Sequence, residues 1–534
     1  MIKGFRQIAL LTGISRVFGL VRDITYGYFF GAGALFDAWV IAFRIPNLSR
    51  RLFGEGAASA SLIPIYSETL HQNPDEAKQF VNTVVTALFV LLGVLVLVGE
   101  AGIWIYYRLF ASNSDTQLIL SLTSVMLPYM LMICTVAILA GILNVHRHFA
   151  APAAAPIVLN IFIIGSTLLT GTLLHVTVRE QLFYVAVAVI IAGLVQVAMQ
   201  VFPLRRAGVF IKPAWNVRSD SFRKMILLMG PMVIGLTVTQ INTLADDLIA
   251  WWLSGSDVKG WFFTFLGRQI AYPLQRSSVS HLYYAQRLYQ LPLGVFGISL
   301  ATAVFPVMSQ FSTQRDFQGL AKTAAKALRT AVFIALPATV GLIIVARLLI
   351  SLFFEHGRFS PKDTQMTAFT LTFYAIGLCG YFAQQILSRA FYSMQHSKLP
   401  MFSAVIAVVL NIVLNLVLVW PLGRGGLACS TALCSYLQVV ILLVALHRTL
   451  GGDILSGFPL SLAKTAAATA CMGAVGYATL KLSGHLHNAV RLALIIGFSV
   501  PVYLSVARLF RIKALSYLTD NKKGLGRIDS EKSI

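Results

Sequence analysis

The chain has 534 residues, of which 57% are hydrophobic and 12% are charged, and its mean hydropathy is +0.77. These values exclude a soluble globular protein and predict an all-α polytopic membrane protein. The formal net charge of +22 does not indicate a nucleic-acid partner, because the 42 lysines and arginines lie partly in short loops and partly inside apolar segments.

Apolar runs separated by polar, proline or glycine residues predict the membrane spans, since a hydrocarbon core roughly 30 Å thick needs about 20 apolar residues per helix. The pattern predicts fourteen transmembrane helices, at residues 8–31, 35–64, 79–107, 117–144, 151–174, 181–203, 225–254, 281–310, 322–350, 364–393, 400–420, 426–447, 459–482 and 488–510. The basic loop 204–224 and the basic tail 511–534 place both termini in the cytoplasm under the positive-inside rule.

Polar and charged residues interrupt the first two predicted helices. These residues are Ser15, Arg16, Arg22, Asp23, Asp37, Arg44, Arg50, Arg51 and Glu55. An arginine at the centre of an inserted helix costs about 2.5–3.5 kcal/mol, and intramembrane charges nearly always face a bundle interior or a water-filled cavity. Because the arginines outnumber the carboxylates, this stretch predicts a cavity that holds an anion.

A pattern in the first half of the chain recurs in the second half. Residues 59–67 and residues 301–309 each contain three small residues, two apolar residues, a proline, an aliphatic residue, any residue and a serine. The interval covers six predicted helices. Because six is an even number, the copies run in the same direction and predict two parallel-repeat six-helix lobes around a central cavity, followed by two C-terminal helices.

The predicted domains follow from these lobes. They are residues 1–203 (helices 1–6), the basic cytoplasmic linker 204–224, residues 225–447 (helices 7–12), residues 448–510 (helices 13–14) and the basic cytoplasmic tail 511–534. Residues 256–280 form an insertion between helices 7 and 8. Its aromatic and basic residues suit an interfacial segment on the outer face, and a loop that only caps the bundle is the alternative.

Four stretches resemble a known family of transporters. Residues 15–23 (SRVFGLVRD), 30–57 (FGAGALFDAWVIAFRIPNLSRRLFGEGA), 283–306 (YYAQRLYQLPLGVFGISLATAVFP) and 352–359 (LFFEHGRF) resemble the MurJ (MviN) family. These are lipid II flippases of the multidrug/oligosaccharidyl-lipid/polysaccharide exporter superfamily. The resemblance implies export of the undecaprenyl-pyrophosphate-linked peptidoglycan precursor from the inner to the outer leaflet of a bacterial cytoplasmic (inner) membrane.

The resemblance also implies a set of substrate-binding residues. The family's cavity residues fall on Ser15, Arg16, Arg22, Asp37, Arg50, Glu55 and Arg287, and we add Arg51, Asp23 and Ser280. Arg22, Arg50 and Arg287 are the expected pyrophosphate clamp, because a guanidinium stays charged and donates in a planar fork.

Supporting roles are expected around the clamp. Asp37 and Glu55 would hold the arginines while the site is empty. Asp23 has the alternative role of pairing with Arg22 or Arg16. Glycines in the first helix would let it bend or unwind, so that both arginines face one cavity. The alternative for each arginine is a structural role, such as snorkelling to the interface.

A cation site is a further hypothesis, formed by Asp246 with Asn411 and Asn415. The two asparagines are four residues apart and share one helix face, and hard cations take oxygen ligands. A plain interhelical hydrogen-bond cluster is the alternative. We expect no other cofactor, and the five cysteines lie in apolar runs without CxxC spacing. Coupling to the membrane potential is also expected.

The leading prediction is therefore a lipid II flippase without covalent chemistry. Its expected partners are lipid II and membrane lipids, and we expect it to act as a monomer. Export of another polyprenyl-linked glycan is the closer alternative. A membrane enzyme acting on polyprenyl phosphate lipids is the more distant one, and the sequence lacks the HxD or DDxxD patterns that it would need. Helices 13 and 14 would form a groove for the isoprenoid tail or simply pack against the bundle.

Overall fold

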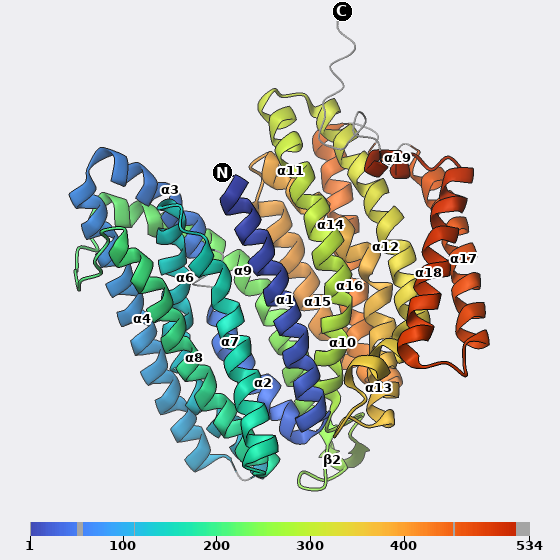
Figure 1. The fold of residues 1–534 in the computed structure, drawn as a ribbon, viewed down its shortest axis with the longest axis horizontal. Helices are drawn as coiled ribbons and strands as arrows, with labels where there is room; N and C mark the ends of the chain where they lie inside the picture. Colours follow the sequence, from blue (N-terminus) through green and yellow to red (C-terminus); the bar gives the residue numbers. More distant parts are fainter. Residues whose placement is uncertain (1, 51–56, 112, 452–453, 456, 520–534) are drawn as a thin grey trace, which may run out of the picture. The chain divides into compact units, whose positions relative to one another are not determined.

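The computed structural model describes residues 2–50, 57–111, 113–451, 454–455 and 457–519, and its elements are almost entirely helical (Figure 1). Packing divides the chain into two compact units. The first contains the residues up to Ser280 together with Gly357–Phe359, and the second contains His281–His356 and the residues from Ser360 onward. Each unit is described by itself below.

The first unit begins with nine helices and ends with four short strands. Its elements are α1 (Ile2–Phe30), α2 (Ala34–Ser49), α3 (Ala57–Gln72), α4 (Pro74–Leu109), α5 (Ser114–Met126), α6 (Tyr129–Val145), α7 (Ala150–Leu168) with the π-helical turn η2 (Leu169–Leu173), α8 (Val178–Arg206), α9 (Asp220–Trp252), β1 (Ser254–Gly255), β2 (Phe262–Phe265), β3 (Arg268–Ala271) and β4 (Leu274–Gln275). Local sequence explains several boundaries. Asn73 caps α4 just before Pro74, and Thr177 with Glu180 forms a capping box at α8.

Helices of the first unit pack in a connected set. α7 packs against both α1 and α8, α6 packs against α8, and α3 packs against α4, α6 and α9. An apolar cluster that includes Leu62, Phe80 and Ile142 fills the space where α3, α4 and α6 meet. α9, which the repeat grouped with the second lobe, therefore packs within the first unit. The lobe boundaries stay a prediction.

The predicted insertion 256–280 contains two small strand pairs. β1 pairs with β4 in parallel, and β2 pairs with β3 as an antiparallel hairpin. The hairpin turn is Leu266–Gly267, with φ of +49° and +76°, as expected for a two-residue turn that needs positive φ at both positions. Leu266 is 88% exposed at the tip. Burial, and then the charge of Arg276, lowers the pKa of Lys259 in this region to about 8.

The second unit is helical throughout its described part. Its elements are α10 (Ser278–Pro292, whose first three residues belong to the first unit), the π-helical turn η3 (Leu293–Gly297), α11 (Ile298–Thr313), α12 (Phe317–Phe354), α13 (Pro361–Ile376), α14 (Leu378–Ser393), α15 (Lys398–Leu422), α16 (Arg424–Leu450), α17 (Phe458–Leu482), α18 (Asn488–Leu509) and α19 (Lys513–Thr519). α12 packs against α13, α14 and α17, while α16 packs against α13, α14 and α15. α17 and α18 pack against each other.

The helix lengths and compositions confirm a polytopic membrane protein. Within the described chain, nine helices are long and apolar enough to span a membrane, or eleven spans result if each of two bent helix pairs counts as one. The predicted segments 8–31, 35–64 and 225–254 are not among these spans. Segments 8–31 and 35–64 carry several of the candidate site charges. The count of fourteen spans stays a prediction.

Two local expectations concern the first two predicted helices. The segment 35–64 covers α2 and the first half of α3, and residues 51–56 between them lie outside the described residues. The first helix was expected to bend or unwind, and α1 runs from Ile2 to Phe30 without unwinding, so only the expected bend stays a prediction. Tertiary packing against α7 stabilises a helix that its glycines alone would weaken.

Candidate functional site

Arg22 lies on α1, where its guanidinium contacts a carboxylate and an amide. Nη2 and Nε donate to Asp23 Oδ1 over 2.8 and 3.1 Å, and Nη1 donates to Asn160 Oδ1 on α7 over 3.0 Å. The side chains of Arg22 and Asp23 are 13% and 6% exposed. Adjacent residues on a helix do not normally face each other, so Arg22 folds back to meet Asp23. Of its two expected partners, Asp23 therefore pairs with Arg22.

Arg16 and Ser15 lie earlier on α1. Arg16 is exposed and Ser15 is half-buried. Because α1 is a continuous helix with about 3.6 residues per turn, Arg16 and Arg22 point roughly 120° apart around its axis. The two guanidinium groups consequently face different directions in this structure.

Arg50 lies at the C-terminal end of α2. Its Nε donates to Asn47 Oδ1 over 2.9 Å, one turn earlier on the same helix. The neighbouring Ser49 is buried, and its hydroxyl contacts Met130 Sδ over 2.8 Å. Arg51 and Glu55, the other expected site residues of this stretch, lie outside the described residues.

Asp37 is fully buried on α2 and caps the N-terminus of α10. Its Oδ2 accepts from the backbone N–H of Ser277 over 2.7 Å, and its Oδ1 accepts from the backbone N–H of Ser280 over 2.7 Å and from the Ser280 hydroxyl. The first N–H groups of a helix have no partner within the helix, and a carboxylate there also favours the helix dipole. In place of the expected arginines, Asp37 therefore holds the start of α10, and Ser280 is one of its donors.

The loop that leads into α10 is anchored as well. Arg276 Nε contacts Asp115 Oδ2 over 3.1 Å, and Arg276 Nη1 donates to the Trp251 carbonyl over 2.8 Å. The Arg276 Cζ also lies 3.4 Å from the centroid of the Trp251 ring. These contacts join the loop to α5 and α9 within the first unit, so the start of α10 is held from three helices.

Arg287 lies on α10 within the second unit. Its Cζ is 4.5 Å from the centroid of the Tyr283 ring, one turn earlier. The neighbouring Gln286 donates to the Tyr374 hydroxyl over 3.1 Å, and Tyr289 stacks on Tyr374 with ring centroids 4.9 Å apart. Arg287 thus lies in an aromatic region of its unit. Convergence of this arginine with those of α1 and α2 on one cavity stays a prediction.

The predicted cation ligands are divided between the two units. Asn415 Nδ2 donates to Asn411 Oδ1 over 3.0 Å, and Asn411 Nδ2 donates to the hydroxyls of Ser430 and Thr431 on α16 over 3.3 Å each. The asparagines therefore form an interhelical hydrogen-bond cluster between α15 and α16, which was the alternative. Asp246 is buried on α9 in the first unit, and its joint cation site with the asparagines stays a prediction.

An ion pair that the sequence analysis did not propose lies beside Asp246. Arg44 on α2 pairs with Asp247 on α9, whose side chain is fully buried. Asp247 therefore contacts an arginine of α2. A periodicity argument could not choose between adjacent aspartates, because that choice depends on how α2 and α9 pack.

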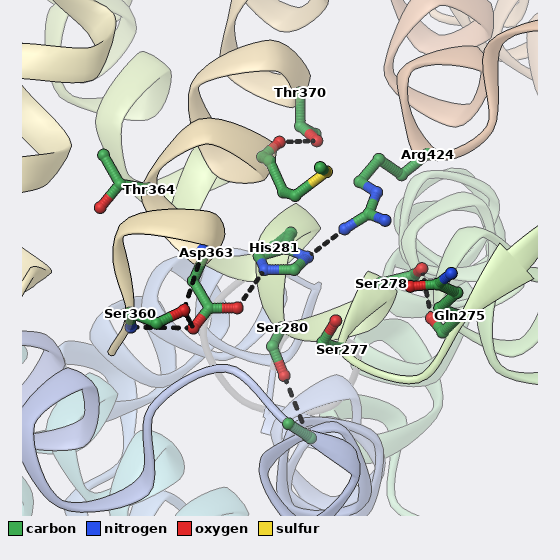
Figure 2. Close-up of polar contacts among 12 residues, drawn as sticks. Gln275, Ser277, Ser278, Ser280, His281, Ser360, Asp363, Thr364, Thr370 and Arg424 are labelled. Atoms are coloured by element: carbon green, nitrogen blue, oxygen red, sulfur yellow. Dashed lines mark hydrogen bonds and ion pairs between the residues drawn. The ribbon is translucent and has the colours of Figure 1, made fainter. Parts of the chain in front are cut away.

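A second unproposed cluster, the His281 cluster, consists of His281, Asp363 and Arg424 (Figure 2). Arg424 Nη1 donates to His281 Nδ1 over 2.5 Å, and His281 Nε2 is 3.0 Å from Asp363 Oδ1. Arginine can only donate, so Nδ1 must accept, and the ring proton lies on Nε2 and is donated to Asp363. His281 is 1% exposed. The cluster therefore joins α10, α13 and α16 around a neutral histidine.

His281→Phe is expected to lower the free energy of unfolding by about 2 kcal/mol, because Asp363 Oδ1 and Arg424 each lose a buried partner. Asp363 keeps its capping-box bonds to Ser360, which limits the loss. Unfolding in mixed detergent micelles measures the change. His356→Phe removes an exposed histidine and should shift stability by no more than about 0.5 kcal/mol. Equal shifts for the two variants would contradict a structural role for the cluster.

One sequence signal could have located part of the His281 cluster. Ser360 and Asp363 form a capping box, a serine followed three residues later by an acidic residue at a helix start. That pattern marks Asp363 as fixed at the N-terminus of α13. The partners His281 and Arg424 carry no comparable local signal, because they are far apart in the sequence. His281 lies 82 positions before Asp363, and Arg424 lies 143 positions after His281.

Comparison with known proteins identifies the family. A family model described as Lipid II flippase MurJ matches residues 26–497. The chain belongs to this family. A probable lipid II flippase MurJ of Vibrio cholerae serotype O1 is 31% identical over 535 residues, which cover 96% of this chain and 97% of the relative. A MurJ relative with the same description from Rickettsia prowazekii is 30% identical and covers 82% of each chain.

Solved structures support the family assignment, and a transporter of another family has a similar fold. A structure of lipid II flippase MurJ in an inward closed conformation has a TM-score of 0.75 at 26% identity, covering 95% of this chain and 99% of that chain. An inward-facing multidrug resistance MATE family transporter of the MOP superfamily has a TM-score of 0.63 at 14% identity, covering 82% and 94%. The second likeness concerns the fold alone. The MurJ family resemblance of the sequence is therefore confirmed, and the family is one of flippases rather than enzymes.

Proposed function

We propose that this protein moves lipid II, the undecaprenyl-pyrophosphate-linked disaccharide peptide, from the inner to the outer leaflet of a bacterial cytoplasmic membrane by alternating access. Family membership supports the substrate and the activity. One structural observation carries the site: the Arg22 guanidinium is largely buried among apolar helices, between Asp23 and Asn160. Such a charge is costly in a membrane protein unless a ligand or a functional partner needs it.

The proposed headgroup site uses arginines from both halves of the chain. Arg22, Arg50 and Arg287 bind the pyrophosphate, and Arg16 assists. A diphosphate offers several acceptor oxygens, and hydrogen bonds between two charged groups are roughly twice as strong as neutral ones. The phosphate oxygens therefore compete well with the neutral Asn47 amide at Arg50 and with the Tyr283 ring at Arg287.

At Arg22 the ligand exchanges with an existing partner. The Asp23 carboxylate balances the guanidinium charge while the site is empty, which lets an apolar bundle hold the arginine without a ligand. Asn160 keeps one N–H of the fork engaged. The remaining N–H groups then donate to the pyrophosphate instead of to Asp23. This exchange gives Asp23 a holding role at Arg22 like the one that the sequence analysis expected of Asp37 and Glu55.

Membrane potential supplies a driving force in this proposal. Moving one charge through 100 mV is worth about 2.3 kcal/mol, so two negative charges leaving a negative interior gain about 4–5 kcal/mol. Both termini lie in the cytoplasm, which the basic segments 204–224 and 511–534 favour. The protein acts as a monomer, and the isoprenoid tail lies along α17 and α18.

Transport into the outer leaflet of reconstituted vesicles tests the proposal. Vesicles with labelled lipid II should expose the label outside several-fold faster with the protein than without it, and faster again with an inside-negative potential. Mass spectrometry should recover the lipid unaltered. A labelled phosphatidylcholine serves as the control, because its headgroup has no net charge and should not be moved. A chemically altered lipid, or exposure that the protein does not accelerate, would overturn the proposal.

A further inference from the structure

A groove of about 600 Å³ lies on the surface of the first unit, between α4, α6 and α8, which lie side by side (Figure 1). One face of α8 lines its length, with Leu194, Val197, Ala198, Val201, Phe202 and Arg205. These positions recur at intervals of three and four residues, as one helical stripe does. From Leu194 to Arg205 the stripe is roughly 16 Å long at 1.5 Å per residue. The groove is therefore long, narrow and apolar, with a cation at one end.

Helix packing explains why the groove exists and which way it opens. α6 packs against both α4 and α8 and forms the floor, and the bend of 41° between α5 and α6 lies at the Pro128 wall. A Cβ at Gly193 would lie 2.8 Å from Met132 Sδ, so α8 and α6 touch closely beneath the groove. Phe89 on α4 and Phe202 on α8 are 57% and 60% exposed at its edges. The groove consequently opens to the lipid side.

Arg205 gives the groove one polar end. Its guanidinium makes no ion pair or hydrogen bond with the part of the chain that the structure describes. The neighbouring Arg206 differs, because its Cζ lies 4.3 Å from the centroid of the Phe202 ring and Arg206 does not line the groove. An arginine at the end of an apolar slot suits a ligand with an acyl chain and a negative headgroup.

A basic strap, residues 207–219, borders the same end. The Lys212 backbone N–H donates to Asn82 Oδ1 over 3.0 Å, and the Ala214 N–H donates to Thr86 Oγ1 over 3.2 Å. Asn82 and Thr86 lie on the α4 face that continues to Phe89. Trp215 on the strap is 62% exposed, as is typical of aromatic side chains at the headgroup level of a bilayer. The strap thus sets the groove's cationic end at the membrane interface.

We propose that this groove binds one anionic glycerophospholipid, with an acyl chain along the α8 stripe and the phosphate on Arg205 beside the strap. The groove volume lies within the roughly 300–1,000 Å³ of ordinary ligand pockets. The occupant comes from the bilayer because the groove opens to it, and the charge of Arg205 and of the basic strap selects an anionic headgroup. This site is separate from the arginines proposed for lipid II and does not depend on them.

Native mass spectrometry of the full-length protein tests the site, with palmitoyl-oleoyl phosphatidylglycerol as the probe and palmitoyl-oleoyl phosphatidylcholine as its neutral counterpart. Arg205→Gln should weaken phosphatidylglycerol binding about tenfold, the loss of one charge-assisted contact. Arg206→Gln removes the same charge from the next residue and should change binding by less than about twofold. Equal losses for the two variants, or equal binding of the two lipids, would overturn the proposal.

A photoreactive phosphatidylglycerol with a diazirine on its acyl chain gives a test that needs no substitution. Crosslinks should concentrate in residues 194–205 of α8 and in residues 128–135 at the start of α6. Excess unlabelled phosphatidylglycerol should suppress them, and excess phosphatidylcholine should not. Crosslinks spread evenly over the outer helices would show an ordinary lipid annulus and would refute a specific site.

Discussion

Arg22→Ala is expected to reduce lipid II transport by about 100-fold or more, because removing one partner of a buried charge pair costs about 2–5 kcal/mol and each 1.4 kcal/mol is a factor of ten. The substitution removes the hydrogen bonds to Asp23 and to Asn160. In the proposed mechanism it also removes a ligand of the pyrophosphate. Growth after depletion of the native flippase, together with vesicle transport, measures the loss.

A double variant separates the two roles of Arg22. Arg22→Ala alone leaves the buried Asp23 without its arginine, so part of its effect is structural. Arg22→Ala with Asp23→Ala removes that unbalanced charge and should restore the thermal stability but not the transport. Arg108→Ala, on the exposed C-terminal turn of α4, controls for the loss of one cation. If the double variant regains transport, Arg22 serves only to balance Asp23, and the proposed headgroup site fails.

Asp37→Ala is expected to lower the free energy of unfolding by about 3–4 kcal/mol. Three donors lose their acceptor in a fully buried position, namely the N–H groups of Ser277 and Ser280 and the Ser280 hydroxyl. Each unsatisfied buried donor costs about 1–3 kcal/mol, and partial relaxation keeps the sum near the lower end. Denaturation in mixed micelles measures the energy, and hydrogen exchange at residues 277–280 should rise in the same variant.

Two companion variants bracket this result. Ser280→Ala removes one hydroxyl donor but keeps the backbone bond to Asp37, so it should cost only about 1 kcal/mol. Asp75→Ala removes a carboxylate whose side chain is 90% exposed in the first turn of α4, and its effect should stay within about 0.5 kcal/mol. A loss for Asp37→Ala no larger than that for Asp75→Ala would mean that the cap does not stabilise α10.

The contacts of Ser280 give it a structural role beside its proposed role in substrate binding. The sequence analysis placed it among the substrate-binding residues, and that role stays a proposal. In the structure its hydroxyl and N–H donate to Asp37, so it also fixes the first turn of the helix that carries Arg287. A transport defect in Ser280→Ala therefore needs the stability measurement beside it, because a shifted α10 would move Arg287 without any lost ligand contact.

The high hydropathy and the arginines that interrupt the apolar segments could be read from the sequence alone, because both are properties of short stretches. The all-α membrane class and the unusual character of α1 and α2 followed from them, and the family followed from the resemblance of four sequence stretches. The number of spans was harder to read, because the charged segments 8–31 and 35–64 fall short of a clear membrane signal, whereas the segment that carries Arg287 does not. In those two segments the charged residues that suggest the site also lower the hydropathy by which a membrane helix is recognised.

Partner choice was decided only by the tertiary structure. Asp37 contacts Ser280 across 243 positions, Arg44 contacts Asp247, and Arg22 contacts Asn160 across 138 positions. Hydrogen bonds and ion pairs act over a few ångströms, so they depend on which helix faces pack together rather than on spacing along the chain. The sequence determined that charges must be satisfied inside this membrane protein, and helix packing decided which groups satisfy them.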